Sequence, residues 1–251
     1  MNTFSKWLGA GLGFTFGGPI GAIIGFALGS FVDGFSIQDF NTAKKEFENN
    51  SKGSQSRTQS GDFEISLLVL ASIVIKADGK IDRRELDFVR AQFVGMYGKE
   101  RANNAFKLFK GIVKESVATH QVCSQIRQYM PHASRLQLLH FLFGIAKADE
   151  FVSEQEVDEI RKIANYLNIN SRDYGSIKAM FYQESDAAYK ILEIDKSASD
   201  SDLKKAYRKM AKKYHPDKLQ GLGDEHLKGA QEKFQTIQAA YEAIKKERGI
   251  S

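Results

Sequence analysis

The chain has 251 residues, 42% of them hydrophobic and 27% charged, which is enough to build two modest domains with their own cores. A single cysteine excludes internal disulfides and any multi-cysteine zinc site. The net charge of +5 is too small to indicate a nucleic-acid-binding protein, and three prolines with few strand-like alternations predict an all-α fold.

The N-terminal segment has the pattern of a transmembrane helix. No charged residue occurs from Trp7 to Val32. As a helix this run would be about 39 Å long, more than the roughly 30 Å of a bilayer's hydrocarbon core. We therefore expect residues 1–5 to be a short N-terminal segment and residues 6–32 to cross the lipid bilayer once. The alternative is a hairpin of two short halves, broken at the sequence Gly17-Gly18-Pro19.

Within this predicted span, glycine recurs at every fourth position. Glycine at that interval allows two helices to approach closely in a membrane, so the pattern predicts self-association into a homodimer or larger homo-oligomer. The glycines concerned are Gly9, Gly13, Gly17, Gly21, Gly25 and Gly29.

A flexible linker is predicted over residues 33–61, because its second half is rich in Ser, Gln, Asn and Gly. A helical domain is then predicted over residues 62–183. Two almost wholly apolar helices, 63–77 and 136–148, are expected to form its central hairpin, since a helix that is apolar on all sides must be buried. More amphipathic helices, predicted over 101–113, 117–129 and 171–181, would surround that hairpin.

Each apolar helix is followed by one copy of a duplicated motif, KADGKIDRREL at residues 76–86 and KADEFVSEQEV at residues 147–157. In both copies a capping residue stands three positions before a glutamate, a spacing that predicts a capping box at a helix N-terminus. These pairs are Asp82 with Glu85 and Ser153 with Glu156.

The first copy also resembles the second half of a calcium-binding EF-hand loop. However, Val74 and Lys76 stand where the first two carboxylates should be, and a calcium ion needs six or more oxygen ligands. We therefore expect helix capping and no metal site. The duplicated pattern resembles the TerB-type helical domain, some members of which bind metal through acidic residues.

The C-terminal part contains a strongly amphipathic segment, LKKAYRKMAKKYHPD at residues 203–217. Ser199 is its predicted N-cap, and Pro216 ends the helix because proline lacks the backbone N–H. Wound as a helix, the segment places its lysines and arginine on one face and its apolar residues in one arc. That arc contains Leu203, Ala206, Tyr207, Met210, Ala211 and Tyr214. The basic face is either a solvated surface or a binding surface, and nucleic acid is one alternative ligand.

A second amphipathic helix is predicted to cover this apolar arc as an antiparallel partner, and Asp186 is expected to begin a short helix before both. We expect Tyr207 and Phe234 to be buried in the thin core between the two helices. The apolar positions of the second helix are Leu227, Phe234, Ile237, Tyr241 and Ile244.

The order of these segments resembles the J-domain of the DnaJ family, predicted here over residues 186–251. The resemblance rests on the segments at 189–192 and 233–241 and on the tripeptide that follows the basic helix. It implies a helical hairpin with a chaperone-activating motif at its tip, His215, Pro216 and Asp217, which engages a DnaK-type chaperone ATPase. It also implies a partner-binding face made of Lys204, Tyr207, Arg208 and Lys209. J-domains often have glycine where this chain has Glu193.

A glycine-rich membrane helix, a TerB-like domain and a J-domain, in that order, resemble the DjlA family of membrane-anchored DnaJ-like co-chaperones. The resemblance implies a single-pass protein of the cell inner membrane, with its bulk in the cytoplasm, that stimulates a DnaK-type ATPase. We expect no enzyme activity, cofactor or nucleic-acid partner, because no catalytic constellation or phosphate-binding loop occurs. The alternative is an envelope sensor or scaffold whose TerB-like domain binds a ligand or signalling partner. The remaining histidines, His120, His132, His140 and His226, are expected to be structural or surface residues.

Overall fold

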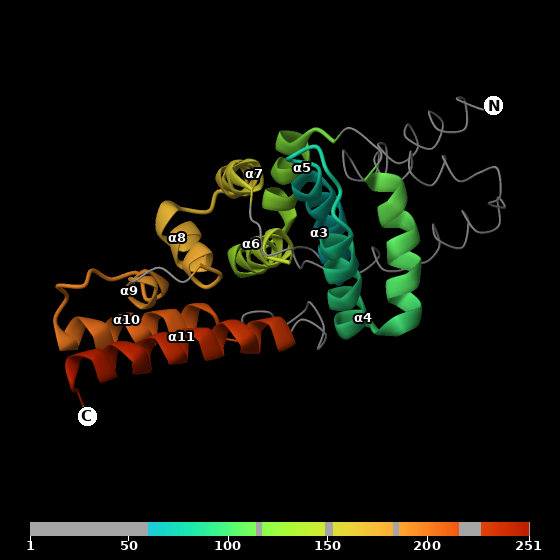
Figure 1. Ribbon diagram of the computed structural model, residues 1–251. Coiled ribbons are helices and arrows are strands. Elements are labelled where there is room, and N and C mark those ends of the chain that lie inside the picture. The colour runs from blue at the N-terminus through green and yellow to red at the C-terminus, as the bar shows by residue number, and fades with distance from the viewer. Residues whose placement is uncertain (1–59, 114–116, 149–152, 183–185, 216–226, 251) are drawn as a thin grey trace, which may run out of the picture.

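The computed structural model describes residues 60–113, 117–148, 153–182, 186–215 and 227–250 (Figure 1). The predicted transmembrane helix with its six glycines, and nearly all of the predicted linker, lie outside these ranges. In the part that is described, no helix is long and apolar enough to cross a membrane. Every regular element in the same ranges is a helix, which confirms the all-α prediction.

The helices fall into two groups (Figure 1). We call the first group the bundle and the second the C-terminal hairpin. The bundle consists of α3 (Ser60–Ile75), α4 (Arg83–Ile112), α5 (Thr119–Tyr129), α6 (His132–Ala146), α7 (Glu154–Tyr166) and α8 (Ser171–Ala179). The C-terminal hairpin consists of α9 (Ala187–Ile191), α10 (Asp200–Lys213) and α11 (Leu227–Arg248).

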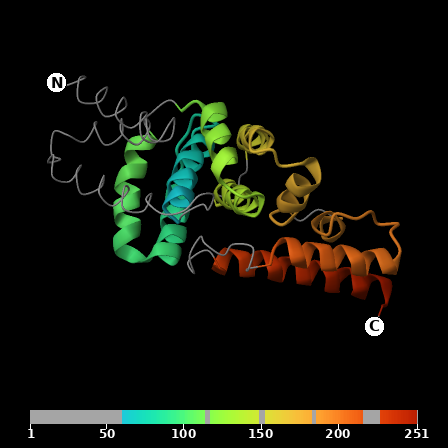
Figure 2. The ribbon, with the colours of Figure 1, turned by 180° about the vertical axis from the view of Figure 1, so that it is seen from behind.

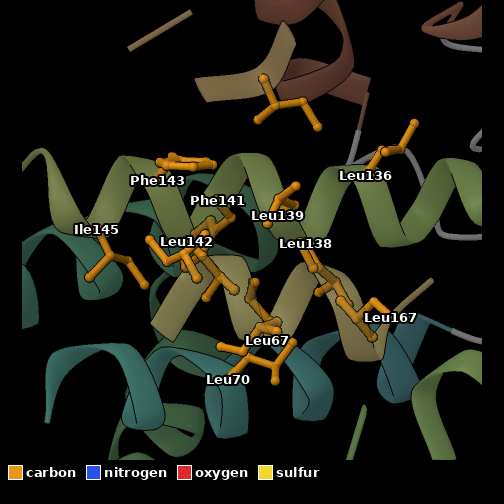
Figure 3. Close-up of a cluster of buried hydrophobic side chains, with 14 of the residues drawn as sticks. Leu67, Leu70, Leu136, Leu138, Leu139, Phe141, Leu142, Phe143, Ile145 and Leu167 are labelled. Carbon is orange, nitrogen blue, oxygen red and sulfur yellow. The ribbon is translucent and has the colours of Figure 1, made fainter. Parts of the chain in front are cut away.

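The two apolar helices, α3 and α6, pack against each other in the centre of the bundle. Figure 3 shows Leu67 and Leu70 of α3 lying on the side of α6 that carries Leu138 and Leu142, while Phe143 points from the opposite side. All five side chains are almost completely buried. The predicted central pair is therefore confirmed, although α4 and α5 separate the two helices in sequence, so that they do not form a hairpin of consecutive helices.

Both predicted capping boxes are present. The backbone N–H of Asp82 donates to Oε2 of Glu85 at 3.2 Å, and the Asp82 carboxylate accepts from the first turn of α4. At the start of α7, the N–H of Ser153 donates to Oε2 of Glu156 at 2.9 Å, and the N–H of Glu156 donates to Oγ of Ser153 at 3.1 Å. The repeated motif therefore begins a helix in both copies. Within the described ranges, no group of three or more His, Cys, Asp or Glu side chains is placed to hold a metal ion.

The long helix α4 is broken at Gly98, whose φ of 76° and ψ of 166° are not helical. A positive φ favours glycine because a Cβ would be strained there. The chain turns at this residue, and the two halves of α4 then contact each other, since Nη2 of Arg90 donates to Oδ1 of Asn103 at 3.1 Å. The second half corresponds to the helix predicted over residues 101–113.

In the C-terminal hairpin, α10 and α11 run antiparallel and side by side (Figures 1 and 2). Four residues of the apolar arc of α10 are buried as predicted, namely Leu203, Ala206, Met210 and Tyr214. Tyr207 stacks on Tyr241 with ring centroids 4.3 Å apart. Tyr207 and Phe234, however, are only half-buried, and the prediction that both are core residues was wrong. Lys233 is the buried neighbour instead, with 2% of its surface exposed. Helix α11 contacts α9 and α10, and near its N-terminal end it also contacts α6 of the bundle, so more than one of its sides is buried.

The two groups of helices are joined by a short connection and pack together. Helix α9 lies between α8 and α11 (Figure 2). The hydroxyl of Ser176 in α8 donates to the carbonyl oxygen of Ile191 at 2.7 Å. At the N-terminal end of α11, Gly229 lies so close to Gln137 of α6 that a Cβ would clash with the Gln137 amide. The C-terminal hairpin therefore contacts the bundle through both α9 and α11.

Candidate functional site

The outward face of α10 carries the basic residues that the sequence singled out. Ser199 caps the helix by accepting a hydrogen bond from the N–H of Asp202 at 3.2 Å, which fixes where the basic face begins. Along this helix the side chains of Lys204, Arg208 and Lys209 are exposed, and Tyr207 is half-buried against α11. The four residues expected at a partner-binding face therefore belong to one short helix whose opposite side is packed.

The tip of the C-terminal hairpin begins immediately after α10. His215 is exposed, and its ring meets the ring of Phe234 edge to face, with centroids 6.3 Å apart. The preceding residue, Tyr214, is buried against the bundle and the C-terminal hairpin. Pro216 and Asp217, the other two members of the predicted motif, lie outside the described residues. The exposed imidazole of His215 therefore follows directly after a buried helix end.

Two carboxylates meet the basic residues at the C-terminal end of α10. Glu193 accepts from Nζ of Lys209 at 3.1 Å and from Nζ of Lys213 at 2.5 Å. Lys213 also forms an ion pair with Asp173, which belongs to α8 of the bundle. We call Asp173 and Glu193 the acidic clasp. Their side chains are only 1% and 3% exposed, so both charges depend on their partners.

Asp173 is held by more than one donor. His132 Nε2 lies 2.9 Å from its Oδ2, and the amide of Asn170 donates to the same oxygen at 3.0 Å. Burial alone would raise the pKa of Asp173, but the hydrogen bonds from His132 and Lys213, together with the Lys213 charge, outweigh burial and hold that pKa well below its usual range. The carboxylate is therefore ionised at neutral pH.

Lys233 is a second buried charge between the bundle and the C-terminal hairpin. Its ammonium lies 5.4 Å from the centre of the Tyr214 ring, and the structure gives it no ion-pair partner among the described residues. Burial lowers the pKa of Lys233 to about 7. Burial and the Lys233 charge also lower the pKa of His140 in α6 well below its ordinary value, which places this histidine in the same contact.

Comparison with known proteins gives three family matches along the chain. Residues 1–56 match the co-chaperone DjlA transmembrane domain, residues 64–179 match the tellurite resistance protein TerB, and residues 187–249 match the DnaJ domain. No solved structure matches the chain.

Curated relatives extend the match over the full length. The co-chaperone protein DjlA of Vibrio cholerae is 31% identical over 288 residues, covering 100% of both chains. The chain belongs to the DjlA family of co-chaperones. The DjlA protein of Coxiella burnetii is 29% identical, again over 100% of both chains. The chaperone protein DnaJ of Fusobacterium nucleatum is 55% identical over 56 residues, which is 22% of this chain and 14% of that protein.

These matches make the chain a membrane-anchored J-domain co-chaperone of the DjlA family. The backbone conformation explains the departure noted at Glu193. This residue has a φ of 58°, in the left-handed region that glycine adopts most easily. The DjlA-family chain therefore keeps the backbone conformation expected of a glycine there, and gains a carboxylate aimed at Lys209 and Lys213.

The structure brings together residues that the sequence did not connect. Asp173 and Lys213 are far apart in the chain, and no sequence pattern indicates that they pair. The only local signal was the Asn170-x-x-Asp173 spacing, which predicts an N-cap, and the N–H of Asp173 does donate to Oδ1 of Asn170 at 2.9 Å. Of the histidines expected to be structural, His120 meets the Tyr166 ring and the half-buried His140 meets the Phe181 ring, whereas His226 lies outside the described residues.

Proposed function

We propose that this DjlA-family co-chaperone stimulates the ATPase of a DnaK-type chaperone through its J-domain. In this proposal His215, Pro216 and Asp217 form the activating tip, and Lys204, Tyr207, Arg208 and Lys209 form the face that meets the ATPase. The chain itself catalyses no reaction. The tip acts by favouring one conformation of its partner, as any differential contact does.

The observation that supports the proposal most strongly is the arrangement of charge on α10. Lys204 and Arg208 are exposed on a helix that is packed along its other side, and the exposed His215 follows at the end of that helix. A ridge of positive charge attracts an acidic surface and raises the rate of encounter. Binding through such a ridge should also weaken as salt is added.

We further propose that residues 6–32 cross the cell inner membrane once, with the bundle and the J-domain in the cytoplasm, where a DnaK-type partner has ATP available. The glycines at every fourth position of this segment would bring two copies of the chain together. Tags at the two termini, tested for access from each side of the membrane, would determine the orientation.

The function is tested by measuring ATP turnover of the purified DnaK-type chaperone with the full-length protein in lipid nanodiscs. The wild type is expected to raise ATP turnover. His215→Gln is expected to reduce this stimulation by about tenfold or more, because a hydrogen bond to a charged group contributes about 1.5–3 kcal/mol. His120→Gln is the matched control, since His120 is an exposed histidine of the bundle that contacts Tyr166. Equal stimulation by the wild type and His215→Gln would remove the proposal.

A further inference from the structure

The last turn of α10 is restrained by the bundle at the point where the partner is expected to bind. Lys209 belongs to the proposed partner-binding face, and Lys213 lies one turn further toward the tip. Both donate to the acidic clasp, Lys209 to Glu193 and Lys213 to Glu193 and Asp173. Since Asp173 is part of α8, the clasp joins the J-domain to the TerB-like bundle two residues before His215.

The clasp neutralises charge that an acidic partner would otherwise use. Two carboxylates that are 1% and 3% exposed face Lys209 and Lys213, so the charges of these two lysines are neutralised within the chain. The partner's acidic surface must therefore compete with Asp173 and Glu193. Farther from the tip, the exposed Arg208 has no such acidic neighbour among the described residues.

The clasp is built so that it can open. A surface depression of about 550 Å³ lies beside it, lined by the first turn of α8 and by Glu193, Lys209 and Lys213. The side chain of Lys213 is 20% exposed, so a group from another protein can approach it through this depression. If Lys213 leaves, Asp173 keeps the hydrogen bonds from His132 and Asn170, and Glu193 keeps Lys209. Neither buried carboxylate would then be left without a partner. Release of a lysine is strongly unfavourable only when it leaves a buried charge unpaired.

We propose that Asp173 and Glu193 set the affinity for the partner chaperone by competing with it for Lys213, so that full engagement of the J-domain requires Lys213 to leave the TerB-like bundle. This inference rests on the proposed function. It gives the TerB-like bundle a direct role in partner binding, because one of the two competing carboxylates belongs to α8.

The first test compares the full-length wild type with Asp173→Asn and Glu193→Gln in the ATP-turnover assay, over a range of co-chaperone concentrations. Each variant is expected to reach half-maximal stimulation at a concentration about threefold or more below that of the wild type, with the same maximum. Asp87→Asn is the matched control. It makes the same change in net charge, and Asp87 pairs with Arg83 on the exposed surface of α4.

The second test reads the clasp directly, through the chemical reactivity of the Lys213 ammonium. Lysine acylation followed by mass spectrometry should show slow modification of Lys213 in the free wild type and faster modification in Glu193→Gln. Lys246, an exposed lysine of α11, is the control. It should be modified faster than Lys213 in the wild type and at the same rate in both proteins. The proposed competition would be overturned if the wild type and both variants had the same half-maximal concentration. It would also be overturned if Lys213 reacted equally fast in the wild type and in Glu193→Gln. No stimulation by the wild type at any concentration would instead overturn the proposed function.

Discussion

Replacing Phe143 with alanine is expected to lower the free energy of unfolding of the bundle by about 3–5 kcal/mol. The ring is fully buried in α6 and packs against three other rings, at centroid distances of 5.5 Å from Tyr174, 6.0 Å from Phe181 and 6.3 Å from Tyr182. Removing it leaves a cavity between α6 and α8 that rigid neighbours cannot fill. The loss is a large fraction of the roughly 5–15 kcal/mol that stabilises a typical domain.

Urea denaturation of the full chain in detergent micelles, followed by far-ultraviolet circular dichroism, would measure this change. Tyr129→Ala is the matched control, because Tyr129 is an aromatic residue of the bundle whose surface is 63% exposed. Its replacement is expected to change stability by no more than about 0.5 kcal/mol. A loss below about 1 kcal/mol for Phe143→Ala would contradict the packing described here.

Lys233→Met is expected to stabilise the contact between the bundle and the C-terminal hairpin and to remove a pH dependence. Burial lowers the pKa of Lys233 from 10.5 to about 7 in the folded protein. Between these two values the unfolded chain binds more protons than the folded one, so stability rises with pH, by at most about 1.4 kcal/mol per pH unit. Above pH 10.5 Lys233 is neutral in both states and its burial costs no stability by this route. Stability is lost as the pH falls from 10.5 toward 7, and this effect changes no further below pH 7.

At pH 7 the wild type therefore lacks up to about 4 kcal/mol that it would have with Lys233 neutral in both states. Methionine has a similar shape and no charge, so the variant should be more stable at pH 7 and should lose the slope between pH 7 and 9. Above pH 9 the raised pKa values of Cys123, Tyr182 and Tyr214 add a slope of the opposite sign in both proteins. Lys246→Met, at an exposed position of the same helix, should keep the wild-type slope. The pKa of His140 is lowered, so its own effect on stability falls below pH 7, outside this window. A slope that persists in Lys233→Met would show that this lysine is not buried as described.

Much of the fold was predictable because its causes are local. The segments at 63–77 and 136–148 are apolar on every side, so only a central position in a bundle could bury them. The pairs Asp82 with Glu85 and Ser153 with Glu156 carry their own hydrogen-bonding partners, and a capping box depends on nothing distant in the chain. The basic helix was predictable for the same reason, since its apolar arc and N-cap are both read within one short segment.

The contacts between the bundle and the C-terminal hairpin were not predictable, because they depend on how two separately folded groups of helices meet. The apolar pattern of α11 was matched to α10 alone, so it gave no indication that Lys233 is buried. The contact with α6 adds a second buried side, and Lys233 lies there. Asp173 had a sufficient local role as part of the N-terminal turn of α8, so nothing in the sequence indicated its pairing with Lys213.

The central claim, that the exposed face of α10 contacts the partner's ATPase domain, is tested most directly by site-specific photocrosslinking. A photoreactive residue is placed at Arg208 in the full-length protein, and another at Arg83, whose side chain is 92% exposed on α4. We predict a crosslink to the ATPase domain of the DnaK-type chaperone from position 208, suppressed by excess wild type, and none from position 83. Crosslinks of equal yield from both positions, or from position 83 alone, would contradict the claim.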